Sequence, residues 1–197
     1  MLEVRELKGH GFGPVSLSLS AGACLGVSGP SGAGKSRLLR AVVDLDPHEG
    51  SVRLEGYPRE RYTGPQWRQR VGYVPADSRW WADTVEAHFQ CPEALPLADL
   101  GLEPGLLAYP SHRLSSGERQ RLALLRQWEL QPQVLLLDEP TANLDGHGRE
   151  RFEAFVRRYQ RERKAALLWV SHDREQLLRV SDRRACMESG RFREVDS

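Results

Sequence analysis

The sequence predicts an α/β fold with a central, mostly parallel sheet, peripheral antiparallel strands and a small helical subdomain. Four short apolar runs without alternation are typical of strands buried on both faces, namely residues 24–28, 71–74, 134–137 and 166–170. Helical patterns lie between these runs, so strands and helices alternate along the chain. That alternation predicts layers in which helices cover a parallel sheet.

The first part of the chain adds strands of a second kind. Residues 15–19 and 51–55 alternate between apolar and polar side chains, which predicts half-buried, antiparallel strands near one edge. A helix is expected directly after Lys35, because apolar side chains recur there at helical spacing. The same spacing predicts helices around residues 122–128 and 152–159.

Residues 83–131 depart from this regular alternation. Four prolines interrupt the segment and separate short helical pieces: Pro92, Pro96, Pro104 and Pro110. We therefore expect a small helical subdomain inserted into one domain that spans residues 1–197. A chain of 197 residues is long enough for one buried core and short for two full domains.

The composition excludes several classes of function. Lys and Arg total 28 against 27 Asp and Glu, so no nucleic-acid partner is expected. Three widely spaced cysteines predict neither a disulfide framework nor a zinc site. No apolar stretch approaches the roughly 20 residues that span a bilayer. Because the N-terminus also lacks the pattern of a secretory signal, we expect a cytosolic location.

A glycine-rich string follows the first apolar run and precedes a helical pattern. It fits the P-loop pattern G-x-x-x-x-G-K-[ST], whose backbone N–H groups cradle a polyphosphate at a helix N-terminus. Lys35 would reach the β/γ-phosphate oxygens, and Ser36 would contribute an oxygen to Mg²⁺. The residues expected to bind the nucleotide are Gly29, Pro30, Ser31, Gly32, Ala33, Gly34, Lys35, Ser36 and Arg37.

Two carboxylates end the apolar run 134–137. Mg²⁺ beside a P-loop needs an oxygen partner from a neighbouring strand end, so Asp138 is the metal-side candidate together with Ser36. Successive residues at a strand end point in different directions. Glu139 is therefore expected to face the γ-phosphate and to polarise the attacking water.

Residues 114–118 begin the helix that carries Leu122. Ser115 and Glu118 have the spacing of a capping box, which is also the simple structural explanation of this motif. With the flexible Gly117, the same helix end could bind a second phosphate. Because one chain cannot easily bring both cradles to the same γ-phosphate, a second subunit is suggested.

These motifs, in this order, resemble the ATPase subunit of an ABC transporter of the short bacterial type. The resemblance covers nearly the whole chain and includes residues 29–36, 114–118, 134–139, 141–145 and 171–173. It implies a P-loop NTPase that binds ATP and Mg²⁺ in a head-to-tail homodimer. Each ATP would lie between the P-loop of one copy and the 114–118 signature of the other. The resemblance further implies a separate transmembrane permease, which would hold this chain at the inner face of the cell membrane.

The resemblance also implies roles for single residues. Asp138 would support Mg²⁺, Glu139 would be the general base, and His172 would sense the γ-phosphate. The residues expected to act across the dimer interface are Ser115, Ser116, Gly117, Glu118 and Asp145.

The chain departs from the family pattern at several positions. Ala76 stands where the family usually has a Gln that contacts Mg²⁺, and Asp77 is the candidate replacement. Ser116, Glu118 and Arg37 also differ from the usual residues, and these changes are expected to preserve ATP binding.

No Tyr precedes the P-loop at the usual place for adenine stacking. Phe12 and His10 are the nearby candidates, with core packing as the alternative for Phe12.

Two other functions compete with a transporter ATPase. One is a soluble ABC-type ATPase in DNA repair, translation or cofactor assembly, although the insertions, zinc motifs and fused units of such proteins are not visible. The other is a non-hydrolysing binding module, against which Glu139 argues. Residues 166–173 and the short length are similar to small bacterial subunits for metal or iron export, which leaves the cargo open.

Overall fold

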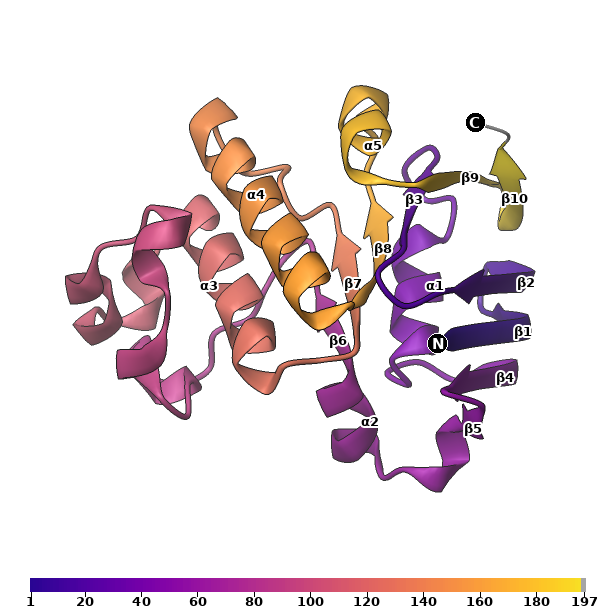
Figure 1. Ribbon diagram of the computed structural model, residues 1–197, viewed down its shortest axis with the longest axis horizontal. Coiled ribbons are helices and arrows are strands. Elements are labelled where there is room, and N and C mark those ends of the chain that lie inside the picture. The colour runs from indigo at the N-terminus through magenta and orange to yellow at the C-terminus, as the bar shows by residue number, and fades with distance from the viewer. Residues whose placement is uncertain (196–197) are drawn as a thin grey trace.

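Two sheets form the framework of the protein in the computed structural model, which describes residues 1–195 (Figure 1). The larger sheet has the strand order β10-β9-β3-β8-β7-β6, and the smaller has the order β2-β1-β4-β5. The larger sheet comprises β3 (Cys24–Ser28), β6 (Val71–Val74), β7 (Val134–Asp138), β8 (Ala166–Val170), β9 (Arg183–Glu188) and β10 (Arg191–Val195). The smaller sheet comprises β1 (Leu2–Gly9), β2 (Phe12–Leu19), β4 (His48–Leu54) and β5 (Tyr57–Pro58).

The predicted α/β class is confirmed, with parallel strands at the centre. β3, β6, β7, β8 and β9 run parallel, and β10 alone in this sheet runs antiparallel to its neighbour. Every residue of β7 and β8 is buried, as expected of strands covered on both faces. The peripheral strands β2 and β4 pair antiparallel with β1, in agreement with their alternating sequences.

The large sheet separates two hydrophobic cores. Side chains alternate across a strand, so Leu136 joins one core whereas Leu135 and Leu137 join the other. The first core contains the helix α1 (Lys35–Val42), which lies between the two sheets in Figure 1. The second core is covered by α3 (Ser116–Leu130), α4 (Gly146–Arg163) and α5 (Arg174–Val180). The result is a set of layers that places α1 and its P-loop at one end of β3.

The segment between β6 and α3 consists of short 3₁₀ turns. These are η2 (Glu86–His88), η3 (Pro92–Ala94), η4 (Leu97–Leu100), η5 (Pro104–Ala108) and η6 (Ser111–Arg113). Proline occupies the start of η3 and η5, where its missing N–H costs nothing. Leucines of this segment, Leu100 among them, pack into the second core with α3 and α4. The division of the chain into one domain with a subdomain at 83–131 stays a prediction.

Several elements were not predicted. They are β1, β5, β9, β10, α2 (Gly64–Arg70) and α5, together with the 3₁₀ turn η1 (Arg59–Arg61). β1 was missed because a bulge interrupts its alternation of apolar and polar side chains. At this bulge Glu6 has a φ of 48°, and the register with β2 shifts between Val4 and Leu7. In residues 1–195, no helix combines the length and apolar character that crossing a membrane requires.

Candidate functional site

The loop from Gly29 to Gly34 joins β3 to α1 and has the backbone of an anion cradle. Gly29, Gly32 and Gly34 have φ values of 143°, 79° and 102°, which L side chains rarely adopt. A Cβ at Gly29 would overlap the carbonyl oxygen of Met187 in β9. Among the described residues, no side chain caps the N-terminus of α1, so its first-turn N–H groups remain available to a ligand.

Lys35 lies at the start of α1 with only 8% of its surface exposed. Its Nζ donates to the carbonyl oxygens of Gly29 at 2.6 Å and Pro30 at 3.0 Å. The carbonyl oxygens of the loop therefore hold the ammonium group within the loop itself.

A cavity of about 260 Å³ opens at this loop. Residues 31–37 line it together with Asp138 and Glu139. The structure thus brings the P-loop and the strand-end carboxylates together, while Gly29 and Pro30 contribute through their contacts with Lys35. Arg37, which also lines the cavity, donates to the carbonyl oxygen of His10 at 3.1 Å.

Asp138 ends β7 as a buried carboxylate. The Tyr73 hydroxyl donates to Oδ2 at 3.0 Å, whereas Oδ1 is buried and has no hydrogen-bond partner among the described residues. Burial raises the pKa of Asp138, and the hydroxyls of Ser36 and Tyr73 oppose that rise. Burial and the nearby Asp138 charge also raise the pKa of Tyr73, so its phenol stays protonated and acts as a donor.

These residues fit Mg²⁺. Ser36 and Asp138 offer the hard oxygen ligands that this ion prefers, and the orphaned Oδ1 lacks the partner that a cation would provide. In residues 1–195, no group of three or more His, Cys, Asp or Glu could hold a metal without help. Mg²⁺ commonly takes one or two protein ligands and completes its shell with phosphate oxygens and water.

Glu139 and His172 meet because β7 and β8 are neighbouring parallel strands, with Asp138 opposite Val170. The Oε2 atom of Glu139 lies 2.9 Å from Nδ1 of His172, and the His172 backbone N–H donates to the same oxygen at 3.4 Å. Glu139 has a φ of 46°, an uncommon conformation for a residue with a side chain. A carboxylate held beside an imidazole at the edge of this cavity can accept a proton from water.

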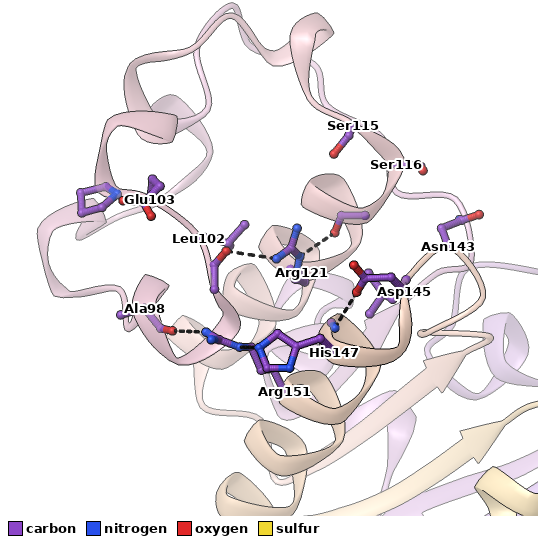
Figure 2. A pocket seen from close by; sticks show the side chains of 15 residues that line it. Ala98, Leu102, Glu103, Ser115, Ser116, Arg121, Asn143, Asp145, His147 and Arg151 are labelled. Carbon is purple, nitrogen blue, oxygen red and sulfur yellow. Dashed lines mark hydrogen bonds between the residues drawn. The ribbon is translucent and has the colours of Figure 1, made fainter.

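A second cavity, of about 720 Å³, lies at the start of α3 (Figure 2). Ser115, Ser116 and Gly117 line it together with Asp145, which is far from them in sequence. A Cβ at Gly117 would stand 3.3 Å from the carbonyl oxygen of Asn143, so the two segments approach closely. This cavity shares no lining residue with the P-loop cavity.

The predicted capping box is present at the start of α3. The Ser115 hydroxyl accepts from the Glu118 backbone N–H at 3.3 Å, and the Glu118 carboxylate accepts from the Ser115 N–H at 2.8 Å. Glu118 is folded back in this way and does not line the cavity. Asp145 likewise caps α4 by accepting from the Gly148 N–H at 2.7 Å.

The second cavity also contains arginines that the sequence did not single out. Arg121 donates to the carbonyl oxygens of Gly117 at 3.2 Å and Leu100 at 2.9 Å. Arg151 donates to Nε2 of His147 at 3.0 Å, as Figure 2 shows. Of these two arginines, only Arg121 could have been found from the sequence. It follows Gly117 by four residues, and this spacing places both residues on the same face of the helix.

Three secondary candidates do not line the nucleotide cavity. Asp77 is exposed and lines a different groove beside Trp80 and Arg119, so it does not reach Asp138. Phe12 is 6% exposed and packs in the first core, in agreement with the alternative of core packing. His10 is exposed.

Fold and site together define a P-loop protein that binds a nucleoside triphosphate. The chain belongs to the ABC transporter family, whose family model matches residues 12–142. It is an ATP-binding ATPase subunit of that family, as the sequence predicted.

Relatives and solved structures agree with this assignment. The probable iron export ATP-binding protein FetA of Escherichia coli K12 is 33% identical over 176 residues, covering 83% of this chain and 78% of FetA. The sulfate/thiosulfate import ATP-binding protein CysA of Mycobacterium bovis is 34% identical over 199 residues. That match covers 93% of this chain but only 56% of CysA, so this chain corresponds to about half of that relative. A solved dimeric ATP-binding cassette bound to ADP and Pi shares the fold over 100% of both chains, with a TM-score of 0.78 and 21% identity.

Proposed function

We propose that this chain hydrolyses ATP as a head-to-tail dimer and thereby drives a separate membrane permease from the cytoplasmic side. Each of two ATP molecules would lie between the P-loop of one copy and the start of α3 in the other. One observation carries this proposal: the P-loop and the start of α3 line two different cavities, and no residue lines both.

The second cradle supports a dimer on physical grounds. The N-terminus of a helix binds anions through its free N–H groups and dipole, and α3 is 15 residues long. Its first turn, at Ser116 and Gly117, lines the same cavity as Asp145. Because the P-loop of the same chain opens elsewhere, a two-fold axis between two copies would give each ATP both cradles.

The chemistry would divide among five side chains. Bound Mg²⁺, held by Ser36 and Asp138, would neutralise charge on the β- and γ-phosphates. Lys35 would bind the same phosphates once its ammonium leaves the loop carbonyls. Glu139 would take a proton from the attacking water at a carboxylate oxygen, and His172 would hold Glu139 in place.

Coupling to a permease is supported by the relatives. FetA and CysA are named as ATP-binding proteins of export and import systems. The matched solved cassette is dimeric and binds ADP and Pi, the products of hydrolysis. Closure of the dimer on ATP and reopening after hydrolysis would shift the permease between two conformations.

A mixing experiment tests the dimer. Lys35→Ala removes the ammonium group from the first cradle and Ser115→Arg blocks the second, so each variant alone should be inactive. In a mixed dimer, one site carries both defects while the other combines an intact Lys35 with an intact Ser115. An equimolar mixture should therefore recover about a quarter of wild-type hydrolysis, because half of the dimers are mixed and each has one complete site. A mixture as inactive as its components contradicts the proposal.

The permease is tested separately. Where the neighbouring reading frame encodes a multi-span membrane protein, co-expression with that protein should move this chain to the membrane fraction. A chain that stays in the soluble fraction argues against coupling.

A further inference from the structure

We propose that Tyr73 is a positioning residue for Asp138, turning one carboxylate oxygen toward the nucleotide cavity so that it can bind Mg²⁺. This inference rests on the proposed function, because it needs a metal at Ser36 and Asp138. In this proposal Tyr73 of β6 orients the Asp138 carboxylate, because the loop after β6 has no side chain that could do so.

The strand register brings the two side chains together. β6 pairs in parallel with β7, and Tyr73 lies opposite Leu136, two residues before Asp138. From this position the Tyr73 hydroxyl spans to Asp138 and donates to Oδ2 at 3.0 Å. The Tyr73 ring packs against the first core, which fixes the direction of the hydroxyl.

The hydrogen bond gives the two carboxylate oxygens different surroundings. Oδ2 is occupied by the Tyr73 hydroxyl, whereas Oδ1 is buried without a partner among the described residues. An unpaired carboxylate oxygen in a buried site is costly unless a ligand satisfies it. Without the hydroxyl, the carboxylate could rotate and exchange its oxygens. With it, one oxygen is reserved for a cation beside Ser36.

The loop that follows β6 offers no side chain that could replace the Tyr73 hydroxyl at Asp138. Ala76 has no polar side chain, and the exposed Asp77 lines a different groove. Gln120, which reaches this loop from α3, donates to the carbonyl oxygen of Pro75 at 3.1 Å and so is already engaged. Tyr73 is therefore the side chain of this region that contacts the metal-side carboxylate.

Tyr73→Phe tests the proposal, because it removes the hydroxyl and keeps the ring in the core. A fluorescent ATP analogue is titrated in EDTA and in Mg²⁺, and Mn²⁺ binding to the nucleotide-loaded protein is followed by electron paramagnetic resonance. Residues that orient a metal ligand typically contribute about 10- to 100-fold to metal affinity. We expect Mn²⁺ binding to weaken by at least about tenfold, with no change in nucleotide affinity in EDTA.

Tyr159→Phe is the matched control. Tyr159 is a buried tyrosine whose hydroxyl, like that of Tyr73, donates a hydrogen bond; its acceptor is the carbonyl oxygen of Pro132 at 2.7 Å, outside the nucleotide cavity. This variant should bind Mn²⁺ like wild type. If Tyr73→Phe also binds Mn²⁺ like wild type, or if both variants lose it equally, the positioning role is wrong.

A double variant separates positioning from a general structural effect. In an Asp138→Ala background, Tyr73→Phe should not reduce Mn²⁺ binding further, because its effect passes through Asp138. A further loss of the same size as in the wild-type background overturns the inference. Failure of the proposed function has a different signature, since the wild-type protein with ATP would then bind no Mn²⁺.

Discussion

Replacing Glu139 by Gln tests the chemical step, because the substitution changes charge and basicity with little change in shape. The amide oxygen of Gln can still accept from the His172 backbone N–H, which lies 3.4 Å from Oε2 in the structure. The amide cannot take a proton from water. Hydrolysis should therefore fail while nucleotide binding persists.

Two magnitudes decide how the result is interpreted. A positioned general base contributes about 10²- to 10⁴-fold to the rate, so a loss of at least a hundredfold corresponds to about 2.7 kcal/mol or more of barrier. The contact with His172 adds little stability, because the imidazole is 72% exposed and even charged pairs at the surface contribute about 0–1 kcal/mol. A large loss of turnover would thus reflect chemistry and not unfolding.

The assay combines phosphate release at saturating ATP with titration of a fluorescent ATP analogue and size-exclusion chromatography. Glu139→Gln should bind the analogue with wild-type affinity and accumulate as a dimer in ATP. Glu175→Gln is the control, since Glu175 is exposed on α5 and changes the net charge equally. A turnover within about tenfold of wild type would refute the assignment of Glu139 as the base.

Three further predictions concern the cradles and the fold. Gly29→Ala should abolish nucleotide binding in a nucleotide titration, because its Cβ would overlap a carbonyl oxygen of β9. Gly56→Ala is the control, since Gly56 also has a positive φ but has open space around it. Urea denaturation should show that this control only lowers the unfolding free energy, by about 1–2 kcal/mol. Glu118→Gln should keep the helix cap and tighten ATP-driven dimerisation, since it removes a negative charge beside the second cradle. Unchanged dimerisation in sedimentation analysis would count against phosphate binding at α3. The Arg40 guanidinium lowers the pKa of Asp46. The ion pair therefore stabilises the fold above the unfolded pKa and is lost as the pH falls through the folded value. Urea denaturation should show Asp46→Asn to be less stable by up to about 1 kcal/mol at neutral pH, with the difference vanishing in acid.

The central strands were predictable because burial on both faces leaves a simple signature. The runs at 134–137 and 166–170 are β7 and β8, and the glycine string lies where a strand–loop–helix unit requires it. β9 was missed because it opens with Arg183 and Arg184, which carry no apolar signal although the strand pairs with β3. A long-range pairing of this kind depends on the rest of the sheet and not on the local sequence.

The candidate site also combines residues that the local sequence reveals with residues that only long-range pairing brings together. Residues that belong to a local motif, such as Lys35 and Asp138, are visible in the sequence. Tyr73 is not, because its relation to Asp138 exists only through the register of β6 with β7. The buried contacts of Gln176 with Thr141 at 2.7 Å and with Glu153 at 2.8 Å are equally hidden, since they join three separate segments.

The backbone at Glu139 explains why a strand end is suited to this chemistry. Its φ of 46° costs about 1–3 kcal/mol for a residue with a side chain. Two hydrogen bonds hold the conformation: the Glu139 N–H donates to the carbonyl oxygen of Val170 at 3.0 Å, and the Ala142 N–H donates to the carbonyl oxygen of Glu139 at 3.2 Å. The first bond extends the β7–β8 pairing and the second begins the turn toward Asp145. The strained residue therefore lies where the rigid sheet meets the loop of the second cavity, so movement of that loop would reach the carboxylate without disturbing the strands.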